Sequence, residues 1–104
     1  MIDARQYVIG KYKPFDFETI TVTNTAIGLT SSKLSATPPP KQAFITVESG
    51  QLRYRMDGTA PTSSVGHILL PQQSLLLEGY SQLNNFQAIR TGSNSGTLQV
   101  TYLR

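Results

Sequence analysis

The chain has 104 residues, of which 38% are apolar and only 14% are charged, and it contains no cysteine. This length supports one hydrophobic core and not two independent domains, and the lack of cysteine excludes disulfides and thiolate metal sites. The formal charge of +3 comes from basic residues scattered along the chain, so we expect no nucleic-acid partner. A surface this poor in charge consists largely of neutral polar side chains, which favours burial against neighbouring proteins.

The first ten residues lack the apolar core of a signal peptide, and no apolar stretch is long enough to span a bilayer. We therefore expect a protein that is made in the cytoplasm and has no membrane partner.

Three prolines at 38–40 divide the chain into an N-terminal arm with the first strands, residues 1–40, and a body, residues 41–104. Proline cannot join a sheet ladder, so we expect the three prolines to act as a stiff spacer within a single structural domain. In residues 17–23, β-branched Ile20 and Val22 alternate with threonines, which predicts a strand. Residues 28–37 are predicted to form an exposed loop or a second short strand.

Two carboxylates alternate with two aromatic rings near the start of this strand. Asp16 and Glu18 would share one face, as a pair of acid–base groups must. No second acidic cluster supports a catalytic cleft, so a solvated face or a partner-binding edge is the better interpretation. Phe15 and Phe17 are the candidate partner-binding residues here.

Residues 43–56 predict a hairpin with a two-residue turn at Ser49-Gly50, where glycine accepts the positive φ of a primed turn. This register sorts apolar from polar side chains, and a slip of one residue would destroy the sorting. The apolar face would hold Ala43, Ile45, Val47, Leu52, Tyr54 and Met56. The other face would pair Phe44 with Arg55, either as a cation–π contact or as an interface anchor. We take Phe44, Arg53 and Arg55 as candidate partner-binding residues.

The rest of the body also predicts strands. Residues 65–70 and 74–78 would form a second hairpin through Pro71-Gln72, and residues 83–90 and 97–103 would flank a glycine-rich hairpin loop. No window has sustained helical periodicity. The predicted fold is all-β: an antiparallel β-sandwich of jelly-roll type with an extended N-terminal arm.

Motifs for catalysis or metal binding are missing. His67 is the only histidine, so a zinc site or a serine triad would lack partners. Asp57-Gly58 is a turn signal without the spaced acidic residues of a calcium loop. We therefore expect no enzyme, no catalytic residues, no metal and no cofactor.

The last sixty residues resemble a pattern found in small β-sandwich proteins encoded among the structural genes of tailed bacteriophages. That pattern contains RYR-DGT-PT, then GH, then FRAIRTG. The matching residues here are Arg53-Tyr54-Arg55, Asp57-Gly58-Thr59, Pro61-Thr62, Gly66-His67 and the segment 86–92. The first forty residues match no family pattern.

The resemblance implies a virion structural protein, and within that class a capsid decoration (cement) protein that bridges major capsid proteins on the capsid surface. Such proteins self-associate, commonly as homotrimers. A tail, neck or fibre protein is an alternative. So is a carbohydrate-binding β-sandwich module, in which Tyr80 or Tyr102 would stack on sugars. Tyr80 is also a candidate partner-binding residue.

Overall fold

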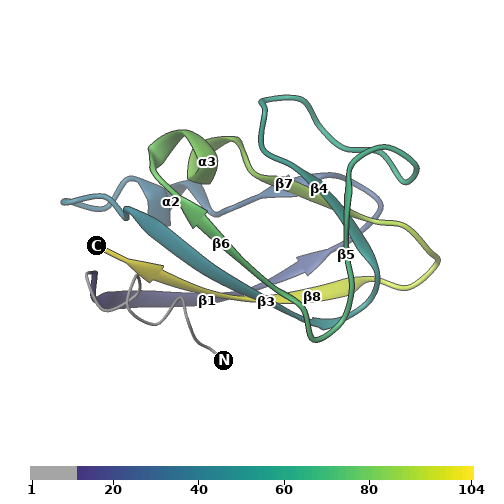
Figure 1. Ribbon diagram of the computed structural model, residues 1–104, viewed down its shortest axis with the longest axis horizontal. Coiled ribbons are helices and arrows are strands. Elements are labelled where there is room, and N and C mark those ends of the chain that lie inside the picture. Colours follow the sequence, from purple (N-terminus) through teal and green to yellow (C-terminus); the bar gives the residue numbers. More distant parts are fainter. Residues whose placement is uncertain (1–11) are drawn as a thin grey trace.

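Two four-stranded antiparallel sheets face each other in the computed structural model, which describes residues 12–104 (Figure 1). Sheet A has the strand order β1 (Pro14–Val22), β8 (Gly96–Leu103), β3 (Gln42–Ser49) and β6 (Ser74–Glu78). Sheet B has the order β2 (Ile27–Gly28), β7 (Gln87–Arg90), β4 (Leu52–Arg55) and β5 (His67–Leu69). Two short helices, α2 (Ser31–Leu34) and α3 (Tyr80–Asn85), complete the described elements. The predicted all-β sandwich is confirmed.

The core lies between the inward faces of the two sheets. Alternate residues of β3 and β8 point into it, as the period of a strand requires. Its completely buried members include Val22, Ala43, Ile45, Leu52, Leu77, Leu98, Val100 and Tyr102. Burial of these side chains is the main source of stability in a chain without disulfides.

Consecutive strands lie in opposite sheets at every connection within residues 14–103 except one. Only β4 and β5 are neighbours in the same sheet, joined by loop 56–66. All three predicted hairpins are therefore wrong, because β3 and β4, β5 and β6, and β7 and β8 each belong to different sheets. Phe44 lies beside Leu76 and Thr101, while Arg55 lies beside Gln87, so the predicted Phe44–Arg55 pair does not form.

The chain passes from β3 to β4 through a corner that only glycine fits. Gly50 has a φ of +84°, and a Cβ there would lie 2.7 Å from the Cα of Gly96. A Cβ on Gly96 would lie 2.5 Å from Leu52 Cδ2 and 2.9 Å from the Ser49 carbonyl oxygen. The β3–β4 and β7–β8 corners thus pack directly against each other, and the predicted positive φ at Gly50 is present in a corner between sheets.

The segment before the prolines belongs to the sandwich. β1 pairs with β8 along its length, from Pro14 opposite Leu103 to Val22 opposite Gly96. Its Ile20 and Val22 are buried in the core, so residues 14–22 are not a separate arm. Residues 1–11 of the predicted arm lie outside the described residues.

Residues 83–90 differ from the predicted strand, because α3 extends to Asn85 and β7 begins at Gln87. A helix of six residues has fewer than two turns, too few to produce a recognisable apolar period. Only Leu83 of this helix is buried. None of the helices in residues 12–104 is long and apolar enough to cross a membrane.

Candidate interaction surfaces

Loop 56–66 is held to sheet B by the two arginines that the sequence assigned to a partner. Arg53 donates from Nε to the Ser63 carbonyl at 3.1 Å and from Nη1 to the Gly66 carbonyl at 2.7 Å. Arg55 forms a two-pronged ion pair with Asp57, with distances of 3.0 and 2.5 Å. That hydrogen-bonded guanidinium lowers the pKa of the Asp57 carboxyl. Both arginines are therefore engaged within their own chain.

The other residues that resemble the phage-protein pattern lie around Tyr54. A Cβ on Gly66, where φ is +141°, would lie 3.1 Å from the Tyr54 carbonyl oxygen. The Tyr54 ring lies 5.3 Å from His67 and 5.8 Å from Phe86, measured between ring centroids. Pro61, within the loop, is buried. These residues hold loop 56–66 in place, so in this chain the pattern has a structural role.

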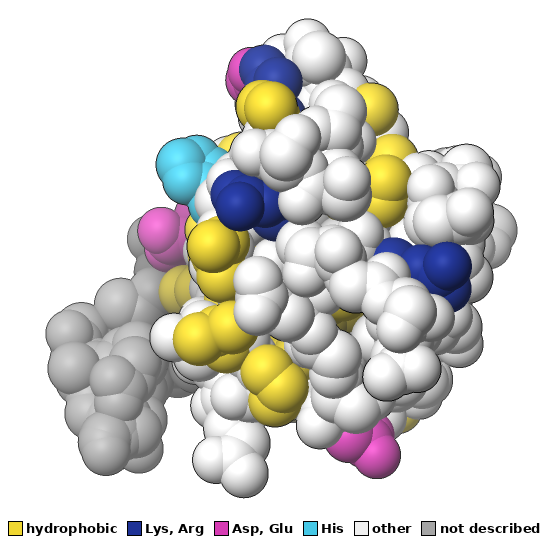
Figure 2. All heavy atoms as spheres, turned by 90° about the vertical axis from the view of Figure 1, so that its right-hand side faces the viewer, with side chains coloured by type: hydrophobic (Ala, Val, Ile, Leu, Met, Phe, Trp, Pro, Cys, Tyr) yellow, Lys and Arg dark blue, Asp and Glu magenta, His cyan; other side chains and the backbone are white. Residues whose placement is uncertain are grey.

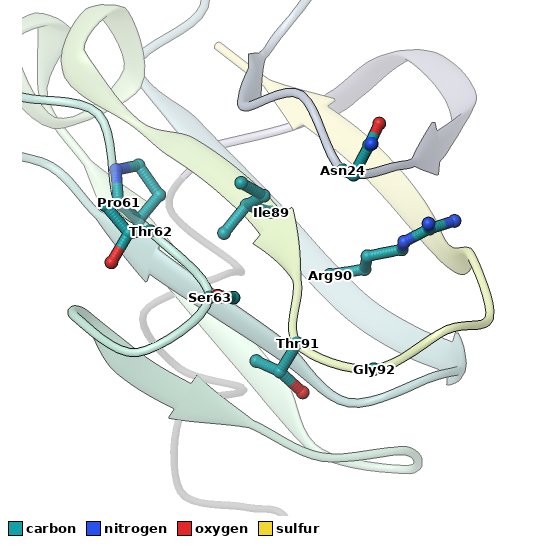
Figure 3. A pocket seen from close by; sticks show the side chains of 8 residues that line it. All are labelled: Asn24, Pro61, Thr62, Ser63, Ile89, Arg90, Thr91 and Gly92. Carbon is teal, nitrogen blue, oxygen red and sulfur yellow. The ribbon is translucent and has the colours of Figure 1, made fainter.

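A hollow of about 470 Å³ opens between loop 56–66 and the end of β7 (Figure 3). Figure 3 shows Pro61 and Ser63 across from Ile89 and Thr91, with Arg90 and Asn24 to one side. No described residue forms an ion pair with Arg90. The lining offers hydroxyls, an amide and a guanidinium, which together suit a polar ligand.

The outer face of sheet A carries a row of side chains that crosses all four strands. Phe17, Thr101, Phe44 and Leu76 are neighbours from β1 to β6. Phe17 is 54% exposed, and the other three are half-buried. We call these four residues the Phe17 row. The sequence identified Phe17 and Phe44 as separate candidate partner-binding residues. In sheet A they lie in one row.

The next row on this face is neutral and polar. Thr19, Gln99, Thr46 and Ser74 are neighbours across the same four strands. The Thr19 hydroxyl donates to Gln99 Oε1 at 2.7 Å. Neither row contains a charged residue.

Phe15 and the carboxylates of β1 are used within the fold. The Arg104 guanidinium lies 4.0 Å from the centroid of the Phe15 ring, which also packs against the core. Lys33 forms a 3.0 Å ion pair with Asp16, and this hydrogen bond, with one from the Phe17 amide, lowers the pKa of Asp16. Phe15 therefore presents less surface than a free aromatic anchor would.

The two tyrosines considered as stacking partners for sugars differ in solvent exposure. Tyr102 is completely buried, so its predicted stacking role is wrong. Tyr80, at the start of α3, is 64% exposed. It lines a smaller hollow of about 280 Å³ together with Pro40, Gln42 and Glu78.

An exposed apolar strip runs along β5, and the sequence-based reasoning missed it. Val65, Ile68 and Leu70 are 52%, 47% and 41% exposed. We call these three residues the β5 edge. Figure 2 shows apolar side chains gathered on the face that carries β5 and the turn into β6. One signal was present in the sequence, because residues 58–77 contain no Asp, Glu, Lys or Arg.

No group of three or more His, Asp or Glu side chains in the described part of the chain is arranged to hold a metal ion. Comparisons of the chain with protein-family models, with curated proteins and with solved structures found no match.

Proposed function

We propose that this chain is a virion structural protein of the capsid decoration type, which acts by binding other proteins through its sheet surfaces. Its partners would be the major capsid protein and further copies of itself, at the outer surface of the capsid. The strand order supports a jelly roll, an architecture of two sheets and eight strands that recurs in viral capsid proteins. The resemblance to phage structural proteins over the last sixty residues supports the same class.

The observation that carries the proposal is the Phe17 row on the outer face of sheet A. Phe17 presents more than half of its surface to solvent on a regular strand, and exposed apolar surface that is contiguous marks interaction sites. Phe44 and Leu76 extend the apolar surface across the sheet. Aromatic anchors beside a neutral polar row are typical of protein interfaces.

The surroundings of the row suit a protein lattice better than a small ligand. Hydroxyl and amide side chains lie along one side of it, and the free energy cost of desolvating such neutral groups is lower than that of desolvating charged groups. No hollow among those described is lined by Phe17, Phe44 or Leu76. A broad surface of this kind suits contact with the broad surface of another protein.

Co-sedimentation with capsid shells tests the proposal. Shells assembled from the major capsid protein encoded near this gene are mixed with the purified full-length chain and pelleted. We expect saturable binding at a fixed number of copies per shell. Binding to isolated tails but not to shells would move the protein to the alternative tail, neck or fibre class, and binding to neither would contradict the virion assignment.

One observation favours the carbohydrate-binding alternative, namely the hollow between loop 56–66 and β7. Arg90, Asn24 and Thr91 there could bind the hydroxyl or carboxylate groups of a sugar. Signals on a glycan array that disappear in Arg90→Ala would support this function. An array without signals would remove it.

A further inference from the structure

β5 is the outermost strand of sheet B, and no described strand lies beyond it. An edge strand presents unpaired backbone N–H and C=O groups, which can pair with another chain. Natural proteins usually protect such edges with charged side chains, prolines or bulges. Of the other edge strands here, β1 carries Asp16 and Glu18 and β6 ends in Glu78. β2 and β5 are both short, with two and three residues.

The β5 edge lacks this electrostatic protection. Ile68 points outward beside Arg53 of β4 and is nearly half exposed, with Val65 and Leu70 exposed on either side of it. The segment 58–77 contains no Asp, Glu, Lys or Arg. The backbone groups of Val65, the Gly66 carbonyl and the backbone groups of Leu70 bond within the chain. Over residues 67–69 the strand combines an outer edge without a neighbouring described strand, the exposed Ile68 side chain and the absence of charge.

We propose that two copies of this chain pair β5 to β5, antiparallel, about a two-fold axis at Ile68. The two B sheets would then form one continuous eight-stranded sheet. This inference deepens the proposed function and rests on it for its place in the virion, because it names the surface and the geometry of self-association.

The absence of charge in residues 58–77 favours a second copy over a charged partner as the occupant. Each copy carries a formal charge of +3, so most approaches of two copies bring like charges together. An isologous contact places each residue near its own counterpart, so a charged edge would repel itself. The β5 edge can meet its own copy without such a juxtaposition. A partner of opposite charge would gain nothing from this surface.

The register of such a pair also fits the side chains. With Ile68 opposite Ile68, His67 lies opposite Leu69 and Gly66 lies opposite Leu70, by counting along antiparallel strands. The exposed parts of Ile68 and Leu70 from both chains would be removed from water, which is the main favourable contribution to association.

A single introduced cysteine tests the two-fold geometry, because the natural chain has none. Directly opposed residues in an antiparallel pair have Cα atoms roughly 4.5–5.5 Å apart, within the range of a disulfide. We expect full-length Ile68→Cys to become a disulfide-linked dimer on mild oxidation, seen on a non-reducing gel. Thr21→Cys, exposed on the edge strand of sheet A, is the matched control. Equal cross-linking of the two variants would overturn the proposal.

The mass in solution provides a second measurement that does not depend on disulfide chemistry. Light scattering after gel filtration should give twice the chain mass for the natural protein. Ile68→Lys should give the mass of a single chain, because it places two ammonium groups face to face, whereas Thr21→Lys should remain a dimer. A monomeric natural protein, or a trimer unaffected by Ile68→Lys, would overturn the inference.

These results are separable from those on capsid binding. A chain that binds shells but fails both tests contradicts only the β5 pairing. A β5-paired dimer that binds neither shells nor tails contradicts the virion function and leaves the pairing intact.

Discussion

The hydroxyl of Tyr102 donates a hydrogen bond to the Glu18 carboxylate between the paired strands β8 and β1. The Thr30 hydroxyl donates to the other oxygen of the same carboxylate. Burial, followed by the contact with Glu18, raises the pKa of Tyr102, so the phenol stays protonated and remains a donor. The network joins the first strand, the last strand and the loop that precedes α2.

Removing the hydroxyl should destabilise the fold. Tyr102→Phe leaves the ring in the core but deprives Glu18 of a donor, which typically costs about 1–3 kcal/mol. Urea unfolding of the full chain should give that loss in the free energy of unfolding. Thr19→Val, which removes the exposed hydrogen bond to Gln99, should cost less than about 0.5 kcal/mol. Equal losses in the two variants would contradict the role of the Tyr102–Glu18 contact.

The corner between the sheets predicts a pair of glycine variants with different outcomes. A methyl group on Gly96 would lie 2.5 Å from Leu52 Cδ2, so Gly96→Ala should destabilise the protein by about 1–3 kcal/mol through overpacking. Gly92, in the loop that precedes β8, has no atom within 4 Å of a built Cβ. Gly92→Ala should therefore be neutral or slightly stabilising. Thermal unfolding that ranks the two variants in the opposite order would refute the packing of the corners.

Arg53 should control the stability of loop 56–66. Arg53→Ala removes the donors to Ser63 and Gly66, so the local opening free energy should fall by about 1–3 kcal/mol, the value of hydrogen bonds from a charged group. Amide hydrogen exchange over residues 62–66 should accelerate about tenfold or more. Arg90→Ala, at the far side of the hollow, should leave these rates unchanged. Unchanged exchange rates in Arg53→Ala would contradict this structural role, and Arg53 would again be a candidate partner-binding residue.

The ion pair of Asp16 and Lys33 predicts a dependence of stability on pH. The pKa of Asp16 is lower in the fold than in the unfolded chain, because Lys33 and the Phe17 amide stabilise its carboxylate. The stabilisation is therefore complete above the unfolded value of about 4 and is lost as the pH falls through the lower folded pKa. Asp16→Asn should lose less stability than the natural protein between about pH 6 and pH 3. Identical losses would show that the pair does not contribute.

The alternation of apolar and polar residues in the sequence predicted side-chain burial more accurately than it predicted strand pairing. Ala43, Ile45, Val47 and Leu52 were expected on one apolar face, and all four are buried. A hairpin and a corner between facing sheets both direct these residues inward, so alternation cannot distinguish the two. Pairing depends on contacts between distant segments, such as β3 with β8.

The candidate partner-binding residues fall into two groups, exposed side chains and side chains bound within their own chain, for a similar physical reason. Phe17 and Tyr80 are exposed, whereas Arg53 and Arg55 bind a loop and an aspartate of their own chain. A guanidinium has the same donors for a loop carbonyl as for a partner, so its use is decided by the fold. Ile68 was missed because the position of β5 at the edge of a sheet is a property of the whole topology.

Capsid binding by variants of the Phe17 row tests the central claim most directly. Titration of capsid shells with Phe17→Ala should show affinity reduced about thirtyfold, the loss of roughly 2 kcal/mol expected for an aromatic hot spot. Tyr80→Ala, which removes a more exposed ring on α3, should bind like the natural chain. Full affinity of Phe17→Ala together with weakened binding of Tyr80→Ala would contradict the assignment of the outer face of sheet A to the partner.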